Sequence, residues 1–161
     1  MMHRHFLFFL FILFSTICCA QDSTSQWTWM KGDMTIPEYA IYGQRGVASK
    51  NNTPGPRFEN CKWIDKAGRL WVFGGQSMTP LQDRLVLNDL WLYDPSTDEW
   101  TWISGDSTNL SLPVYGTKGV PDDTNNPGSL SGAACWTDST GNFWLFRNVL
   151  WKYNPVTYEW T

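Results

Sequence analysis

The chain has 161 residues, a net charge of −3 and 11 tryptophans, and its length suits one ordinary domain. Its 12 Lys and Arg residues are not clustered, which argues against a nucleic-acid-binding surface.

The N-terminus has the pattern of a secretory signal peptide. Arg4 precedes an unbroken apolar run from Phe6 to Phe14, and Ala20 is a small residue at the expected cleavage point before Gln21. A membrane anchor is the alternative, but the run is short for a bilayer and no second hydrophobic segment follows. We therefore expect residues 1–20 to be removed and residues 21–161 to form a secreted, extracellular product.

The expected mature chain has few groups for catalysis or metal binding. Its only histidines, at positions 3 and 5, lie in the signal, which excludes a Ser-His-Asp triad and histidine metal ligands. Cys61 and Cys135 are too few for a zinc site of the common types. Asp122 and Asp123 could pair on calcium, but such sites need six or more converging oxygens. We predict no catalytic, metal or cofactor-binding residues.

Internal self-similarity is the strongest signal in the sequence. A shift of 73 residues superimposes the chain on itself up to Phe146, where the shift falls to 60, so the second copy lacks 13 residues. We assign repeat one to residues 27–99 and repeat two to residues 100–161. Every tryptophan has a counterpart; the pairs are Trp27/Trp100, Trp29/Trp102, Trp63/Trp136, Trp71/Trp144, Trp91/Trp151 and Trp100/Trp160.

Short apolar runs bounded by Gly, Pro, Asp or Ser predict antiparallel strands, and no stretch keeps helical spacing for three turns. Residues 27–29 are expected to form the fourth strand of a further blade. Arg147 and Asn148 must reverse the chain alone, and they fit two-residue hairpin turns poorly, so we expect strain or frayed strand ends there. The other predicted strands are 58–65, 69–74, 87–93 and 99–103, then 131–137, 142–146, 149–153 and 158–160.

Several of these runs resemble the kelch repeat. RLWVFGG at 69–75 has the diglycine that follows the second strand, and LNDLWLYDPSTDEWTWISG at 87–105 has the aromatic and tryptophan of the next two strands. YGTKGV at 115–120 and WTDSTGNFWLF at 136–146 resemble extracellular kelch-type proteins. The resemblance implies an all-β fold, a partial kelch or galactose-oxidase-like β-propeller of about two four-stranded blades. Repeat two departs from it by lacking the diglycine.

Residues at matched repeat positions are expected to be structural, because large flat side chains fill the space between neighbouring blades. A carbohydrate-stacking platform is the alternative for the tryptophans. The structural set is Trp71, Gly74, Gly75, Trp91, Trp100, Trp144, Trp151 and Trp160.

Long connections are the candidate binding segments. Residues 31–57, 76–86 and 104–131 should lie on one rim, where they would bind a protein or carbohydrate partner or act as passive spacers. Within them, Asn51 and Asn109 begin glycosylation sequons. A secreted interaction scaffold is therefore the expected function. The alternatives are a galactose-oxidase-like fragment, whose copper-binding histidines have no counterpart here, and a non-functional truncated product.

Two further expectations follow from the repeat. Cys61 aligns with Ala134, which puts Cys135 one residue out of register and on the opposite strand face, so we predict two unpaired buried thiols, with a disulfide as the alternative. A pair of blades would also leave open sheet edges and uncovered aromatic faces, which favours self-association.

Overall fold

The computed structural model describes residues 27–32, 39–78, 84–108 and 110–161. The chain divides into two compact units, Met1–Met30 and Lys31–Thr161. The strands among the described residues lie in the second unit, and the segment Leu87–Ile103 holds strands and no helix, as predicted.

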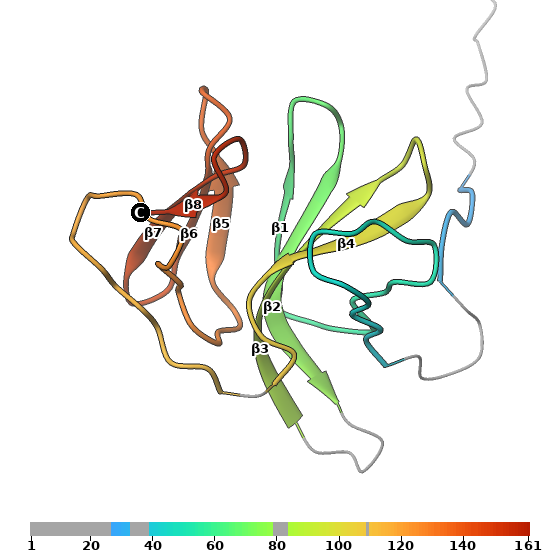
Figure 1. The fold of residues 1–161 in the computed structure, drawn as a ribbon, viewed down its shortest axis with the longest axis horizontal. Helices are drawn as coiled ribbons and strands as arrows, with labels where there is room; N and C mark the ends of the chain where they lie inside the picture. Colours follow the sequence, from blue (N-terminus) through green and yellow to red (C-terminus); the bar gives the residue numbers. More distant parts are fainter. Residues whose placement is uncertain (1–26, 33–38, 79–83, 109) are drawn as a thin grey trace, which may run out of the picture. The chain divides into compact units, whose positions relative to one another are not determined.

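The second unit contains two four-stranded antiparallel sheets, each with its strands in chain order, and each is the predicted blade (Figure 1). The strands of the first blade are β1 (Cys61–Ile64), β2 (Leu70–Met78), β3 (Arg84–Asp94) and β4 (Glu99–Ser104). Those of the second blade are β5 (Ala134–Thr137), β6 (Phe143–Phe146), β7 (Leu150–Asn154) and β8 (Glu159–Trp160). In the described part of the chain, no helix is long and apolar enough to cross a membrane.

Each blade has two faces because side chains alternate along a strand. We call leading the face that carries Trp71 in the first blade and its counterpart Trp144 in the second. The trailing face carries Trp91 and its counterpart Trp151.

The core lies between the leading face of the first blade and the trailing face of the second. Trp63 stacks on Phe143, with ring centroids 5.2 Å apart and planes 6° from parallel, and Phe73 contacts Trp160 at 5.2 Å. Trp71 and Phe143 are 0% exposed. Full burial of one such side chain stabilises a fold by about 1.5–3 kcal/mol, so these aromatics hold the blades together.

A repeated aspartate turn orients one tryptophan of each blade. Asp65 Oδ1 accepts hydrogen bonds from the amides of Ala67 and Arg69, while its Oδ2 accepts one from the Trp71 indole at 2.9 Å. Asp138 does the same for Trp144, at 2.8 Å. The matched Asp and Trp residues of the repeat are thus one hydrogen-bonded unit.

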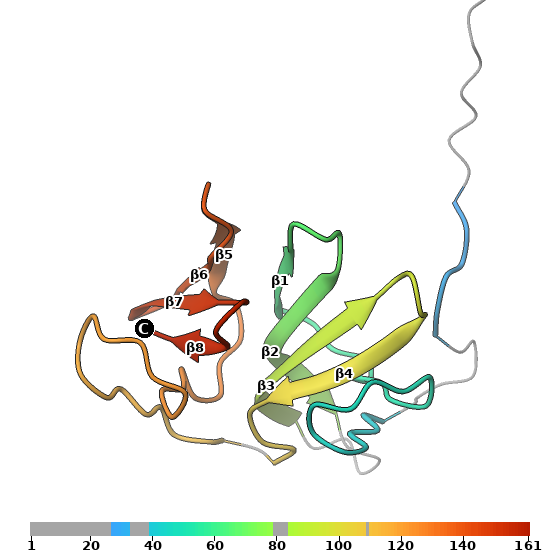
Figure 2. The ribbon, with the colours of Figure 1, turned by 45° about the horizontal axis from the view of Figure 1, so that its top comes forward.

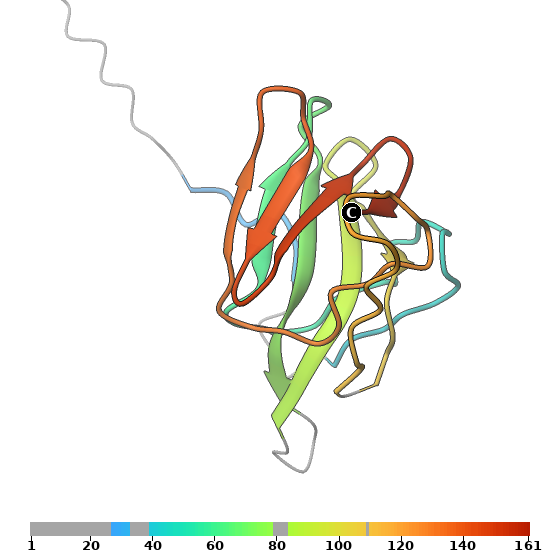
Figure 3. The same cartoon turned by 90° about the vertical axis from the view of Figure 1, so that its left-hand side faces the viewer.

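The diglycine does not end its strand, which corrects the predicted boundary. β2 continues to Met78, pairs with β3 from Arg84 onward, and has a bulge between Phe73 and Gly75. Residues 76–78 and 84–86 therefore extend a hairpin, which reaches beyond the ends of β1 and β4 (Figures 1 and 3).

The turn expected at Arg147 and Asn148 is also different. Phe146 pairs with Leu150, so Val149 joins the connection, and none of these three connecting residues has a positive φ. The prediction of a strained two-residue turn is wrong, because the connection has three residues and none adopts the positive φ that a type I′ or II′ turn needs.

Residues 27–29 do not form the predicted strand, and Trp27 is 100% exposed. Their counterpart, Trp100 in β4, is held in a sheet by pairing with Tyr93 of β3. A strand needs such a neighbour, and neither of the two described sheets includes residues 27–29.

Loops partly cover the outer sheet edges, which corrects the expectation of open edges. Ser49 pairs with Trp100 on β4, and Asp122 makes the equivalent bridge to Trp160 on β8. Figure 2 shows the long segment after β4 passing β8 before it enters β5. Edge pairing between copies is blocked at these points.

Candidate binding rim at the β2–β3 hairpin

Three segments far apart in sequence meet at the hairpin end. Phe58 and Gln76 exchange backbone hydrogen bonds of 3.0 and 2.8 Å, Gln76 pairs with Val86, and the Leu110 amide donates to the Val86 carbonyl at 3.3 Å. Together, residues 56–58, 76–77, 85–86 and 110–112 form what we call the hairpin rim. Parts of the three predicted connections therefore meet at this rim.

The diglycine permits this close approach. Gly74 and Gly75 have φ values of 60° and 91°, in the region that favours glycine. A Cβ on Gly75 would lie 2.7 Å from the Phe58 carbonyl oxygen, and one on Gly74 2.8 Å from that of Leu130. Any larger residue would push these backbones away from the hairpin.

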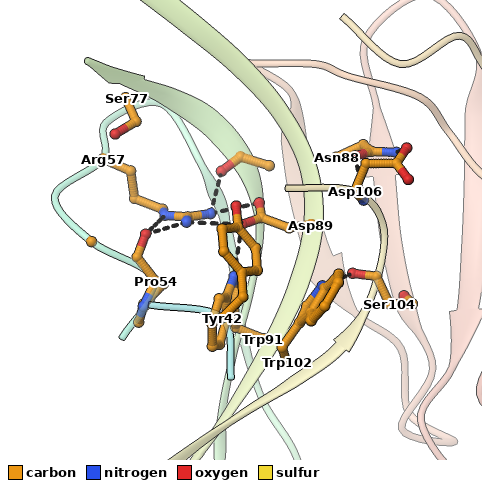
Figure 4. Close-up of polar contacts among 12 residues, drawn as sticks. Tyr42, Pro54, Arg57, Ser77, Asn88, Asp89, Trp91, Trp102, Ser104 and Asp106 are labelled. Carbon is orange, nitrogen blue, oxygen red and sulfur yellow. Dashed lines mark hydrogen bonds and ion pairs between the residues drawn. The ribbon is translucent and has the colours of Figure 1, made fainter. Parts of the chain in front are cut away.

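A buried ion pair fastens the first loop to the blade (Figure 4). The Arg57 guanidinium donates to both carboxylate oxygens of Asp89, at 2.8 and 3.0 Å, and the two side chains are 4% and 0% exposed. Asp89 also accepts from Tyr42 at 2.9 Å and from the Trp91 indole at 2.7 Å. Arg57 donates further to the carbonyls of Gly74 and Pro54.

This network is structural because every strong donor and acceptor in it is engaged within the fold. Burial, with the nearby Asp89 carboxylate, raises the pKa of Tyr42, so its phenol stays protonated and donates. A buried charge without such partners would be strongly destabilising. The network therefore fixes the loop that leads into the hairpin rim.

The repeat did not predict the ion pair, because repeat two does not keep it. Arg57 aligns with Leu130 and Asp89 with Val149, whereas Tyr42 aligns with Tyr115. Both charges are replaced by apolar residues together. The sequence signal that could have revealed the pair is this joint replacement of both charged residues in repeat two.

A second polar cluster fixes the segment after β4. Asn88, 1% exposed, accepts from the Asp106 amide at 2.9 Å and donates to the Asp106 carboxylate at 3.2 Å. A hydrogen bond from the Ser111 hydroxyl lowers the pKa of Asp106 and ties the start of this segment to residue 111. These hydrogen bonds hold the backbone that carries Leu112 in place.

The hairpin rim presents apolar side chains to solvent. Phe58 is 48% exposed, Leu110 68% and Leu112 84%. Scattered single apolar residues are normal on a surface, but these three lie on segments joined side by side by hydrogen bonds. Apolar groups on a fixed backbone suit the recognition of another macromolecule.

The repeat-matched tryptophans differ in burial. Trp71, Trp91, Trp151 and Trp160 are at most 5% exposed, whereas Trp100 and Trp144 are half-buried. Asn51 is exposed, and Asn109 lies outside the described residues.

The cysteines correct the register argument. Both are free, as predicted, but Cys61 is buried and Cys135 only half-buried, and they lie on the two faces that meet in the core. Cys61 Sγ is 3.8 Å from the Ala133 carbonyl oxygen, and Cys135 Sγ is 3.9 Å from that of Lys62. Burial and the adjacent Cys135 thiol raise the pKa of Cys61. Equivalent positions in successive blades point the same way, so a one-residue shift turns one thiol toward the other.

The remaining candidates have local roles. Asp122 Oδ1 accepts from the amide and hydroxyl of Thr124, and these bonds lower its pKa. In the described part of the chain, no group of three or more His, Cys, Asp or Glu residues is placed to hold a metal ion.

Comparison with known proteins agrees with the blade architecture. The Kelch motif family model matches residues 67–102, which span β2, β3 and most of β4. A search of curated proteins gives no match. The match supports a kelch-repeat protein, and kelch repeats typically act as protein-interaction modules.

Proposed function

We propose that this chain is a secreted kelch-repeat scaffold that binds a partner protein through the hairpin rim. The observation that carries the proposal is the convergence of three separate segments with Phe58, Leu110 and Leu112 exposed on them. The Arg57–Asp89 pair and the Asn88–Asp106 contacts fix the backbone segments that lead into the rim. A rigid backbone reduces the ordering cost of binding.

The apolar character of the rim favours a protein partner over a carbohydrate. Sugar-binding platforms present flat aromatic rings, and the most exposed rim residues are the aliphatic Leu110 and Leu112. We therefore expect the partner to bring an apolar surface of its own.

A photo-crosslinking experiment tests the proposal. The full chain carries Leu112→p-benzoylphenylalanine, and a matched control carries the same substitution at Val156, which is 82% exposed in the β7–β8 turn. Both are irradiated in extracellular medium from the source organism. We expect a protein adduct specific to position 112.

The captured protein is then purified and titrated by calorimetry. Leu112→Ser should weaken binding at least tenfold, about 1.4 kcal/mol, whereas Val156→Ser should leave it unchanged. Adducts of equal yield at both positions, or a titration insensitive to Leu112→Ser, would contradict a binding role for the rim.

A further inference from the structure

The covered and uncovered blade faces can be compared residue by residue, because the repeat supplies matched positions. The leading face of the first blade is covered by the second blade, and there Trp63 is 3%, Phe73 1% and Leu90 0% exposed. The same positions on the leading face of the second blade are Trp136, Phe146 and Leu150, which are 44%, 47% and 51% exposed.

The uncovered leading face keeps the same aromatic arrangement. Trp136 and Trp144 stack with centroids 5.9 Å apart and planes 5° from parallel. Lys152 Nζ lies 5.9 Å from the Trp144 ring. Exposed aromatic and aliphatic side chains gathered on one sheet face mark an interaction site.

On the trailing face of the first blade, matched positions are more exposed than on the trailing face of the second blade. In the second blade, Phe143, Tyr153 and Trp160 are buried against the first, at 0%, 1% and 3% exposure. Their counterparts Leu70, Tyr93 and Trp100 are half-buried.

The two trailing faces nevertheless arrange their matched tryptophans alike. Trp91 and Trp100 meet at 6.4 Å and 87°, and Trp151 and Trp160 meet at 6.4 Å and 86°. The loop tyrosines do not alter this match, since Tyr42 contacts Trp91 as Tyr115 contacts Trp151.

We propose that a second copy of this chain covers the leading face of the second blade with the trailing face of its own first blade. The contact would repeat, between chains, the blade interface that exists within each chain. It is heterologous, so it leaves one face of each kind free and continues until a ring closes. Propellers close with four to eight blades, which corresponds to about two to four copies of a two-blade chain.

Sedimentation of the full chain over a range of concentrations tests this proposal. Wild type should sediment as a discrete oligomer. Leu150→Glu, which places a charge on the leading face, should remain monomeric, whereas the equally charged control Val156→Glu should assemble like wild type. Far-UV circular dichroism confirms that each variant is folded.

A mixing experiment tests the head-to-tail geometry. Leu70→Glu blocks the trailing face, so this variant should also be monomeric alone. Mixed with Leu150→Glu, it should form a dimer that grows no further, because each chain retains one intact face. A monomeric wild type, or an oligomer that tolerates both variants, would overturn the proposal; neither outcome depends on the hairpin rim.

Discussion

At the scale of single residues, the fold depends on polar side chains that are fully engaged beneath an aromatic surface. Asp89 accepts four hydrogen bonds from three side chains of other residues while its own side chain is 0% exposed. Asp65 and Asp138 hold the indoles of Trp71 and Trp144 in the same way. Removing the carboxylate of Asp89 would leave the Arg57 guanidinium without its charged partner.

The Arg57–Asp89 pair makes this dependence measurable. Arg57→Leu or Asp89→Val alone should lower the free energy of unfolding by about 3–5 kcal/mol, because one charge stays buried without its partner. The double variant installs the residues of repeat two and should recover most of the loss. Urea denaturation of the three variants gives the coupling energy, and additive losses would show that the pair acts as two independent groups.

The aspartate turn predicts a pH dependence. Hydrogen bonds from Thr140, and then from Trp144, hold the pKa of Asp138 below its ordinary value of 3.8. The folded chain therefore keeps this carboxylate charged where the unfolded chain is protonated, and stability falls as pH drops below that value. Asp138→Asn should flatten this part of the curve of unfolding free energy against pH. An unchanged slope would mean that the turn does not couple to folding.

At the scale of elements, the repeat predicted both blades but misplaced the connections between their strands. Strand positions follow from local alternation, which a sequence displays directly. The bulge at Gly74 and Gly75 depends on the carbonyls of Phe58 and Leu130, distant residues that alternation cannot reveal. The rim could be predicted from chain topology, whereas the ion pair beneath it could not, because repeat two has Leu130 and Val149 at those positions.

Because β1 and β5 are neighbours, we predict that Cys61 of β1 and Cys135 of β5 can form a disulfide. Oxidised glutathione should join Cys61 to Cys135: the two thiols lose two protons and two electrons, and the glutathione disulfide is reduced to two thiols. In the chain-entropy model a loop of this length contributes about 4 kcal/mol. Non-reducing peptide mapping should find the cross-link and its absence in Cys135→Ser. If both cysteines can still be alkylated after oxidation, then β1 and β5 do not lie side by side as described.

At the scale of the whole molecule, the expected signal peptide predicts a defined product. Expressed with residues 1–20 in a secreting host, the chain should appear in the medium beginning at Gln21, because Ala20 ends the apolar segment. Intact-mass spectrometry of the secreted protein measures this directly. A product that retains the N-terminus inside the cell would contradict the assignment.

The same product should lack oxidase activity. With its two histidines at positions 3 and 5, the chain beginning at Gln21 offers no histidine to copper. We expect no hydrogen peroxide from galactose or primary alcohols after copper loading, with a galactose oxidase as the positive control. Copper-dependent peroxide release would restore the enzyme alternative.

The central claim is that two kelch-type blades pack face to face, and one contact tests it most directly. Trp63 and Phe143 belong to different blades, and their rings stack 5.2 Å apart. Nuclear Overhauser spectroscopy on the chain with labelled tryptophan and phenylalanine should detect this pair, and Phe143→Leu should remove the signal without unfolding either sheet. A folded chain without that cross-peak would contradict the packing of the blades.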